Sequence, residues 1–399
     1  MYNQNYKEDM IYATKLNRWL LKPIGIWPKT VETSLIEIIL SRMINLFCIL
    51  FISFFFFAAV LYLIVDVQDV QVRLSKVGSL TFCVMTLTKY SLLIIHEKDI
   101  RYCLNYMEND WKNVKRIEER QIMIEYVDFS RRLILVSAAF AFGGVIIYRV
   151  TIPLFSPKIL VGNLSFKPLA YPISKVIMDT RQSPTNEIMI CLQCFVGLVM
   201  SAITVGCCSM LTVSTMHACS QLKILMSYLN YLITGRSDEN NNVEERLSYW
   251  VQRHVRILSF ISFIKQFLQN ISLIEVLGCT LNMCMLEYYL IMGLKNDSLF
   301  HMITYTILII SFAYNVFIFC YVGEILSNEC RKVADVTYMI DWYRFEGRKG
   351  LILILIIAVS SSSSHRLTAG KFIELSISSF GVLVKTSFAY LNMLRTLTS

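Results

Sequence analysis

One block of the chain constrains its fold more than any other: Met43–Val65 contains no Asp, Glu, Lys or Arg. At about 1.5 Å of rise per helical residue, such a block crosses the roughly 30 Å hydrocarbon core of a bilayer. It begins too far into the chain and is too long to be a signal peptide. The composition agrees with a membrane protein, because apolar residues make up 55% of the chain and charged residues only 17%.

Further apolar blocks follow the first one and predict seven spans in all. The spans are expected at about 39–65, 77–95, 132–154, 188–222, 266–294, 299–325 and 367–395. The fourth is longer than a bilayer requires, so it is expected to project into water. The predicted fold class is an all-α polytopic membrane protein with seven transmembrane helices and cytosolic helical extensions.

The connections between spans also carry structural signals. Glu244–Lys265 alternates apolar and charged residues at helical spacing, which predicts a helix that runs into the fifth span. Gly350–Val359 is apolar but too short to cross a membrane, so it predicts a buried or interfacial helix. The serine run Ser360–Ser364 is expected to form a loop or a frayed connector.

The distribution of lysine and arginine predicts the orientation of the chain. The N-terminal segment and the connections after spans two, four and six carry 25 of these residues, whereas the opposite side, with Arg395 at the end of the last span, carries eight. Basic residues stay on the cytoplasmic side of a membrane. We therefore expect a cytoplasmic N-terminus and, with an odd number of spans, an extracellular C-terminus. Two glycosylation sequons, at Asn163 and Asn296, fall in predicted external loops and agree with this orientation.

Charge and cysteine content exclude several classes of partner. The net charge of +9 is spread over alternating loops and forms no continuous patch, so no nucleic-acid partner is predicted. Most of the 12 cysteines lie inside apolar blocks and are expected to be small packing residues. Cys191 and Cys194 form a CxxC pattern without a second pair or a nearby histidine. Neither a metal site nor a cofactor is therefore predicted.

The C-terminal segment carries the most specific pattern of residues in the chain. Leu367-Thr-Ala-Gly-Lys-Phe372 is followed by Leu375-Ser376, Phe380, Lys385-Thr-Ser-Phe388 and Tyr390. This pattern closely resembles the last helix of insect odorant receptors. The resemblance covers the whole chain in length, topology and span order, and it is most specific over residues 331–395. The serine run before the last span departs from the family, whose link there is usually less repetitive.

The resemblance implies a function and an assembly. Members of this family are ligand-gated, non-selective cation channels in which four subunits surround one pore. A tuning subunit joins a shared co-receptor in a hetero-tetramer, and the co-receptor has a long insertion between spans four and five. That connection is short here, so the chain resembles an odorant-binding tuning subunit in the plasma membrane of olfactory sensory neurons. Its expected partners are the co-receptor, a small volatile or hydrocarbon ligand, lipid and permeant cations.

The resemblance also divides the chain into regions with separate roles. Residues 1–38 are expected to form a cytoplasmic N-terminal segment. Residues 39–325 are expected to form helices one to six, with the odorant pocket in the outer half of the membrane and cytosolic extensions at about 215–265. Residues 326–366 are expected to form a cytoplasmic anchor segment, and residues 367–399 the pore-lining seventh helix and the external C-terminus.

The outer end of the predicted seventh helix is a candidate gate. Thr386, Tyr390, Met393 and Leu397 recur at three- or four-residue spacing and so share a face. If that face meets its symmetry mates, Met393 and Leu397 form apolar rings that can close a pore by dewetting, with Thr396 as a polar lining group. Met393, Thr396 and Leu397 also fall where the gate residues of the resembled family fall. The alternative is that this face packs within its own subunit.

The resembled family binds odorants in the outer membrane half, among spans two to six. Such a pocket is mostly apolar with a few polar groups, and aromatic and methionine side chains supply adaptable contacts. Each candidate is also compatible with ordinary core packing. The candidates are Phe82, Met85, Phe142, Gly143, Ile146, Ile147, Met189, Phe195, Met285, Tyr288, Tyr305 and Phe312.

Charged residues inside the spans are expensive and mark paired or functional sites. Lys89, Glu275 and Glu287 are such residues. Lys89 and Glu275 both lie toward the cytoplasmic half, so an ion pair between them is possible. Arg149 lies near the external end of the third span and is expected to extend its side chain to the membrane surface.

The main alternative is a seven-helix G-protein-coupled chemoreceptor. That class has an external N-terminus, which the basic residues oppose, and the chain lacks Asp-Arg-Tyr after span three and Asn-Pro-x-x-Tyr in span seven. A secondary transporter is disfavoured because no inverted repeat is visible. An enzyme is not predicted, since there is no HExxH, GxSxG or P-loop motif.

Overall fold

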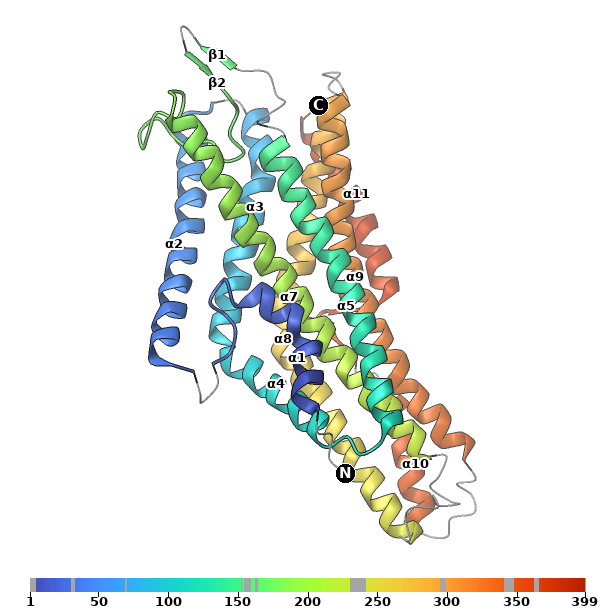
Figure 1. The fold of residues 1–399 in the computed structure, drawn as a ribbon. Coiled ribbons are helices and arrows are strands. Elements are labelled where there is room, and N and C mark those ends of the chain that lie inside the picture. Colours follow the sequence, from blue (N-terminus) through green and yellow to red (C-terminus); the bar gives the residue numbers. More distant parts are fainter. Residues whose placement is uncertain are drawn as a thin grey trace.

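The structure, a computed structural model, is an elongated bundle of helices. It describes residues 5–29, 33–68, 70–151, 153, 159–161, 164–229, 242–294, 299–340, 348–361 and 366–398. The N- and C-terminal ends of the chain lie toward opposite ends of the long axis of the bundle (Figure 1).

Among the described residues, six helices are long and apolar enough to cross a membrane. They are α2 (Leu35–Val65), α3 (Val70–Ile95), α5 (Ile117–Ile146), α7 (Thr185–Leu229), α8 (Val243–Leu294) and α9 (Leu299–Met339). Four other helices accompany them: α1 (Tyr6–Leu21), α4 (Glu97–Lys112), α10 (Arg348–Ser361) and α11 (Ile377–Thr398). The predicted class of an all-α polytopic membrane protein is confirmed.

Short elements of other types connect these helices. A π-helical turn, η1 (Ile147–Thr151), continues α5. Two antiparallel hairpins complete the described chain, β1 (Ile159–Val161) with β2 (Leu164–Phe166) and β3 (Thr368–Ala369) with β4 (Ile373–Glu374).

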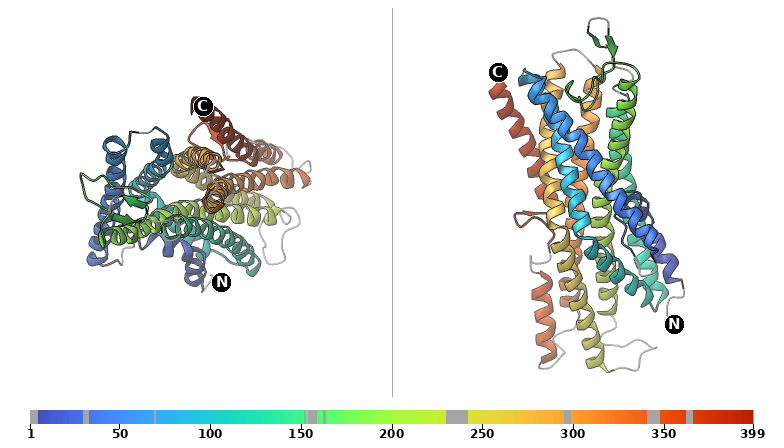
Figure 2. Two further views of the ribbon diagram at one scale, coloured as in Figure 1. Left: turned by 90° about the horizontal axis from the view of Figure 1, so that it is seen from above. Right: turned by 90° about the vertical axis from the view of Figure 1, so that its left-hand side faces the viewer.

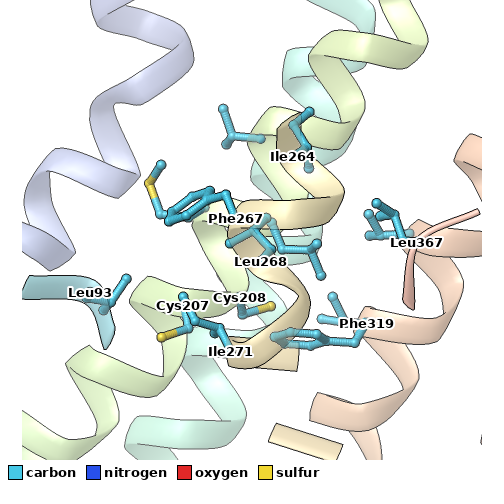
Figure 3. Packing of buried hydrophobic residues seen from close by; sticks show 14 of the residues in the cluster. Leu93, Cys207, Cys208, Ile264, Phe267, Leu268, Ile271, Phe319 and Leu367 are labelled. Carbon is cyan, nitrogen blue, oxygen red and sulfur yellow. The ribbon is translucent and has the colours of Figure 1, made fainter. Parts of the chain in front are cut away.

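The helix α7 forms the centre of the bundle. It is 45 residues long and packs against α1, α3, α5, α8 and α9. Nearly every side chain in its second half is buried, as expected for a helix that is apolar on all faces. Figure 3 shows part of the core beside it, a cluster that contains Cys207, Cys208, Ile271 and Phe319. All twelve cysteines are free and most are buried, so their prediction as packing residues is confirmed.

The periphery of the bundle suits lipid. The helix α2 lies at one edge (Figures 1 and 2). Large apolar side chains along it are exposed, among them Leu35, Ile39, Met43 and Leu50. An exposed apolar surface of this extent is typical of contact with a membrane.

The helices that extend beyond the apolar spans agree with the sequence. The predicted helix over Glu244–Lys265 is confirmed, because α8 runs without a break from Val243 into the membrane. The short helix predicted at Gly350–Val359 is confirmed as α10, which packs against α9. The serine run was expected to be a loop, but α10 includes its first two residues and Ser360 bonds to His254. Residues 362–365 lie outside the described part of the chain.

The seventh helix begins later than predicted. Residues 367–376 form the β3–β4 hairpin, and α11 starts only at Ile377. The N–H of Gly370, at φ +61°, donates to the carbonyl oxygen of Gln269 on α8 at 2.8 Å. Leu375 packs so closely on α9 that a Cβ at Gly323 would lie 2.4 Å from its carbonyl oxygen. Contacts with two other helices therefore override helix formation in this segment.

A buried ion pair joins the middle of the bundle. Lys89 Nζ on α3 lies 2.7 Å from Glu275 Oε2 on α8, and both side chains are fully buried. The ammonium group also donates to Thr204 Oγ1 on α7 at 3.0 Å. The other carboxylate oxygen of Glu275 accepts bonds from Asn315 on α9 and from Cys279. The possible Lys89–Glu275 pair is thus present, and it ties four helices together.

We predict that Lys89→Met strongly destabilises the protein, by about 3–5 kcal/mol, because it leaves the Glu275 carboxylate buried without a countercharge. Adding Glu275→Gln should recover part of the loss, since no uncompensated charge then remains. The apparent melting temperature of the detergent-solubilised protein, followed by size-exclusion chromatography, measures both effects. A double variant whose loss equals the sum of the two single losses would show that the two residues are not coupled.

The docked hairpin generates a second prediction. Gly323→Ala brings a methyl group against the Leu375 carbonyl and should cost about 1–3 kcal/mol by overpacking. Gly381→Ala on α11 is the matched control, because nothing lies within 4 Å of its Cβ position. The same melting assay should show a lower temperature for the first variant only. Equal melting temperatures for both variants would contradict the close packing.

Candidate ligand-binding site

A cavity of about 180 Å³ lies between α3, α5, α7, α8 and α9. A cavity of roughly 150 Å³ accommodates benzene in another protein, so this one is large enough for a small organic molecule. Its wall combines aromatic and aliphatic side chains with hydroxyl, amide and basic groups. The lining residues on α3, α5 and η1 are Lys76, Gly78, Ser79, Phe82, Ser137, Ala141, Gly144, Val145, Tyr148 and Arg149.

The remaining wall comes from the second half of the chain. One lining residue, Tyr171, belongs to the connection between η1 and α7. The others are Ser201 and Thr204 on α7, Asn282, Leu286 and Tyr289 on α8, and Tyr305, Leu308, Ser311, Phe312, Tyr314 and Asn315 on α9.

The structure brings three of the odorant-site candidates together at the cavity. Phe82 on α3 and Phe312 on α9 meet edge to face, with ring centroids 5.7 Å apart, and Tyr305 lines the same wall. These three side chains are half of the aromatic candidates that the sequence offered for an odorant pocket, and Tyr148, Tyr171, Tyr289 and Tyr314 add further aromatic rings to the wall.

The other candidates lie elsewhere. Met85 is buried against Gly278, Phe195 packs beside Phe51 on an outer face, and Ile146 is exposed. Helical phase explains the difference, since residues one or two positions apart face different sides of a helix. The remaining candidates that do not line the cavity are Phe142, Gly143, Ile147, Met189, Met285 and Tyr288.

Arg149 corrects a prediction. The side chain was expected to reach the membrane surface, but it is 4% exposed and lines the cavity. Its guanidinium donates to the Gln193 carbonyl at 2.8 Å and to the Tyr171 hydroxyl at 2.9 Å, and it lies 4.6 Å from the Tyr171 ring centroid. The π-helical turn η1 directs the Arg149 side chain inward. Gly197 leaves room for this side chain, because a Cβ at position 197 would lie 2.6 Å from Arg149 Cδ.

Tyr171 closes the outer side of the cavity. Its N–H donates to Gln193 Oε1 at 3.0 Å, and Gln193 Nε2 donates to its carbonyl at 2.6 Å. Its hydroxyl donates to the Ser79 carbonyl at 3.3 Å. The sequence analysis missed this residue because nothing in a loop sequence shows that it folds back between helices.

The inner end of the cavity is polar. Thr204 and Asn315 line it and also bond to the Lys89–Glu275 pair. Asn315 Nδ2 donates to a carboxylate, so the amide oxygen Oδ1 is the other polar atom of this side chain. Asn315 Oδ1 is buried without a hydrogen-bond partner among the described residues. The sequence held a signal for this polar face, because Ser311 and Asn315 are four residues apart and therefore lie on the same side of α9.

The helix α11 presents two different faces. Leu391 is 6% exposed and Ser387 is buried, where its hydroxyl donates to Glu287 Oε1 on α8 at 3.0 Å. Tyr390 and Met393 are exposed, Met393 by 57%. The candidate gate face is therefore largely exposed in this subunit at these two positions.

The other predicted sites on and near the external side are described only in part. Thr386 is partly buried and donates to the Val382 carbonyl. Thr396 and Leu397 fall in the last turn of α11, where only the backbone is described. Asn163 and Asn296, the glycosylation candidates, lie outside the described residues.

Solved structures share this fold. The insect olfactory receptor OR5 from Machilis hrabei in complex with eugenol superposes with a TM-score of 0.80 at 12% identity, over 99% of this chain and 100% of that one. A second structure of OR5 from Machilis hrabei, whose description names no ligand, superposes with a TM-score of 0.79 at 13% identity, over 98% of this chain and 99% of that one.

Sequence comparison identifies the family. Odorant receptor 10 of Aedes albopictus is 24% identical over 368 residues, which cover 89% of this chain and 91% of that protein. Odorant receptor 63a of Drosophila melanogaster is 23% identical over 174 residues, or 43% and 41% of the two chains. The family model described as 7tm Odorant receptor matches residues 69–388. The resemblance found in the sequence is thus confirmed, and this multi-pass membrane protein belongs to the insect odorant receptor family.

Proposed function

We propose that the chain is the odorant-binding subunit of a ligand-gated, non-selective cation channel, and that the cavity between α3, α5, α7, α8 and α9 is its odorant site. The observation that carries the proposal is an aromatic-walled cavity enclosed by membrane-crossing helices. The OR5 structure in complex with eugenol supports it, because that protein shares the fold and binds a small aromatic compound.

The helix α8 connects the cavity to the pore in this proposal. Leu286 and Tyr289 line the cavity, and Glu287 between them bonds to Ser387 on α11. A ligand that presses on α8 therefore changes the position of α11 through a contact in the same helical turn. Both helices are packed against each other, so a small shift is transmitted without a long path.

The exposed face of α11 supports a pore role. Exposed Tyr390 and Met393 are available to a symmetry-related helix, whereas Leu391 is used within the subunit. Four such faces around an axis form an apolar ring that dewets when narrow and conducts hydrated cations when wide. The chain assembles with a shared co-receptor in a hetero-tetramer, in the plasma membrane of olfactory sensory neurons, with its N-terminus inside and its C-terminus outside.

We predict that the chain, expressed with a co-receptor, gives an odorant-evoked cation current in voltage-clamp recording and little current alone. Phe312→Trp should then raise the half-maximal concentration of an activating compound at least about tenfold, because the larger ring fills the cavity. Phe195→Trp is the control, since Phe195 does not line the cavity. Odorant-evoked G-protein signalling without any co-receptor would instead favour the alternative receptor class.

Cysteine accessibility tests the proposed pore face. In a background with exposed Cys191 replaced by serine, Met393→Cys should react with a charged methanethiosulfonate reagent and change the current of the open channel. Leu391→Cys should not react, because this position is buried within the subunit. The measurement is the current before and after reagent, and the reverse pattern would exclude the proposed orientation of α11.

A further inference from the structure

Two cationic side chains line the cavity without an anionic partner. The Lys76 ammonium group makes no hydrogen bond or ion pair to any described residue, although the backbone carbonyl of Lys76 is bonded. Arg149 donates only to uncharged groups, the Gln193 carbonyl, the Tyr171 hydroxyl and the sulfur of Met200. No aspartate or glutamate is among the lining residues in the part of the chain that the structure describes.

The two cations belong to the same end of the cavity. Lys76 is one helical turn outward from Ser79, whose hydroxyl donates to the Lys76 carbonyl at 2.8 Å. The Ser79 carbonyl accepts from Tyr171, and the Tyr171 hydroxyl in turn accepts from Arg149. A short series of contacts therefore connects the α3 turn that carries Lys76 to the guanidinium of Arg149.

The inner end of the cavity is different. Lys89 lies thirteen residues further along α3, about 20 Å along the helix axis, and its charge is balanced by Glu275 at 2.7 Å. Among the described residues, the chain thus supplies a carboxylate to the cation beneath the cavity and none to the two cations at its outer end. Charges in a membrane-embedded site are costly unless paired, and the missing countercharge points to a ligand that brings it.

We propose that the cavity accepts an organic acid, whose carboxylate lies between Lys76 and Arg149. The apolar body of the acid, a single ring or a short aliphatic chain, contacts Phe82, Tyr305 and Phe312. A guanidinium pairs well with a carboxylate through two parallel hydrogen bonds, and an ammonium adds a second charge-assisted bond. The low dielectric of the site strengthens both interactions. This inference rests on the proposed function of the cavity as the odorant site.

The test uses phenylacetate and its neutral analogue 2-phenylethanol, with hexanoate and hexanol as an aliphatic pair, on cells that carry the chain and a co-receptor. We expect each acid to open the channel at a concentration at least about tenfold lower than its alcohol. Lys76→Gln should raise the half-maximal concentration of phenylacetate about tenfold, or about 1.4 kcal/mol, and leave that of 2-phenylethanol within about twofold.

Two matched variants complete the test. Lys76→Arg keeps the charge and should keep the preference for acids. Lys175→Gln removes an exposed external charge that does not line the cavity, so it should have no effect and thereby excludes a general surface potential. Surface labelling of each variant checks that it reaches the membrane. Arg149 is left unchanged because it also holds Tyr171.

The possible failures are distinguishable. Channels opened by the alcohols but not by the acids, or an acid response that Lys76→Gln leaves intact, would overturn the inference and leave the proposed function standing. A complex that reaches the cell surface and stays closed to a broad panel of neutral and acidic compounds would contradict the proposed function, and the inference with it.

Discussion

The ion pair between Lys89 and Glu275 is the interaction on which the rest of the bundle depends. Van der Waals packing alone does not fix the rotation of apolar helices against one another, because most of their faces are similar. A buried pair with bonds to Thr204 and Asn315 admits only one arrangement of α3, α7, α8 and α9. The same groups form the inner end of the cavity, so the contact that sets the helices in register also sets the depth of the site.

Much of this architecture follows from the sequence because it depends on composition over long stretches. Uncharged blocks located the helices that cross the membrane, and helical periodicity identified the extension of α8. The short α10 followed from an apolar stretch too short to span a membrane. The two opposite charges at Lys89 and Glu275 were noticed because they are rare inside apolar segments. These features require no knowledge of how one helix is rotated against its neighbours.

The residues that line the site were harder to predict, because they depend on how each helix is rotated against its neighbours. Phe82 lines the cavity and Met85, nearly one turn away, packs against Gly278. Large apolar residues occupy every face of these helices, so apolarity alone does not tell lining residues from core. Arg149 turns inward through a π-helical turn, and Tyr171 reaches the cavity through a folded loop. Both depend on tertiary contacts that leave no local signal.

The hairpin before α11 has a mechanical consequence. The Gly370–Gln269 bond and the close approach of Leu375 to Gly323 hold the N-terminal end of α11 on two neighbouring helices. A helix that is held at one end tilts about that end and does not move along its own axis. The displacement of each residue grows with its distance from the held end. A tilt of a few degrees at the hairpin thus becomes a shift of an ångström or more, about 25 Å further along, at the turn that carries Met393.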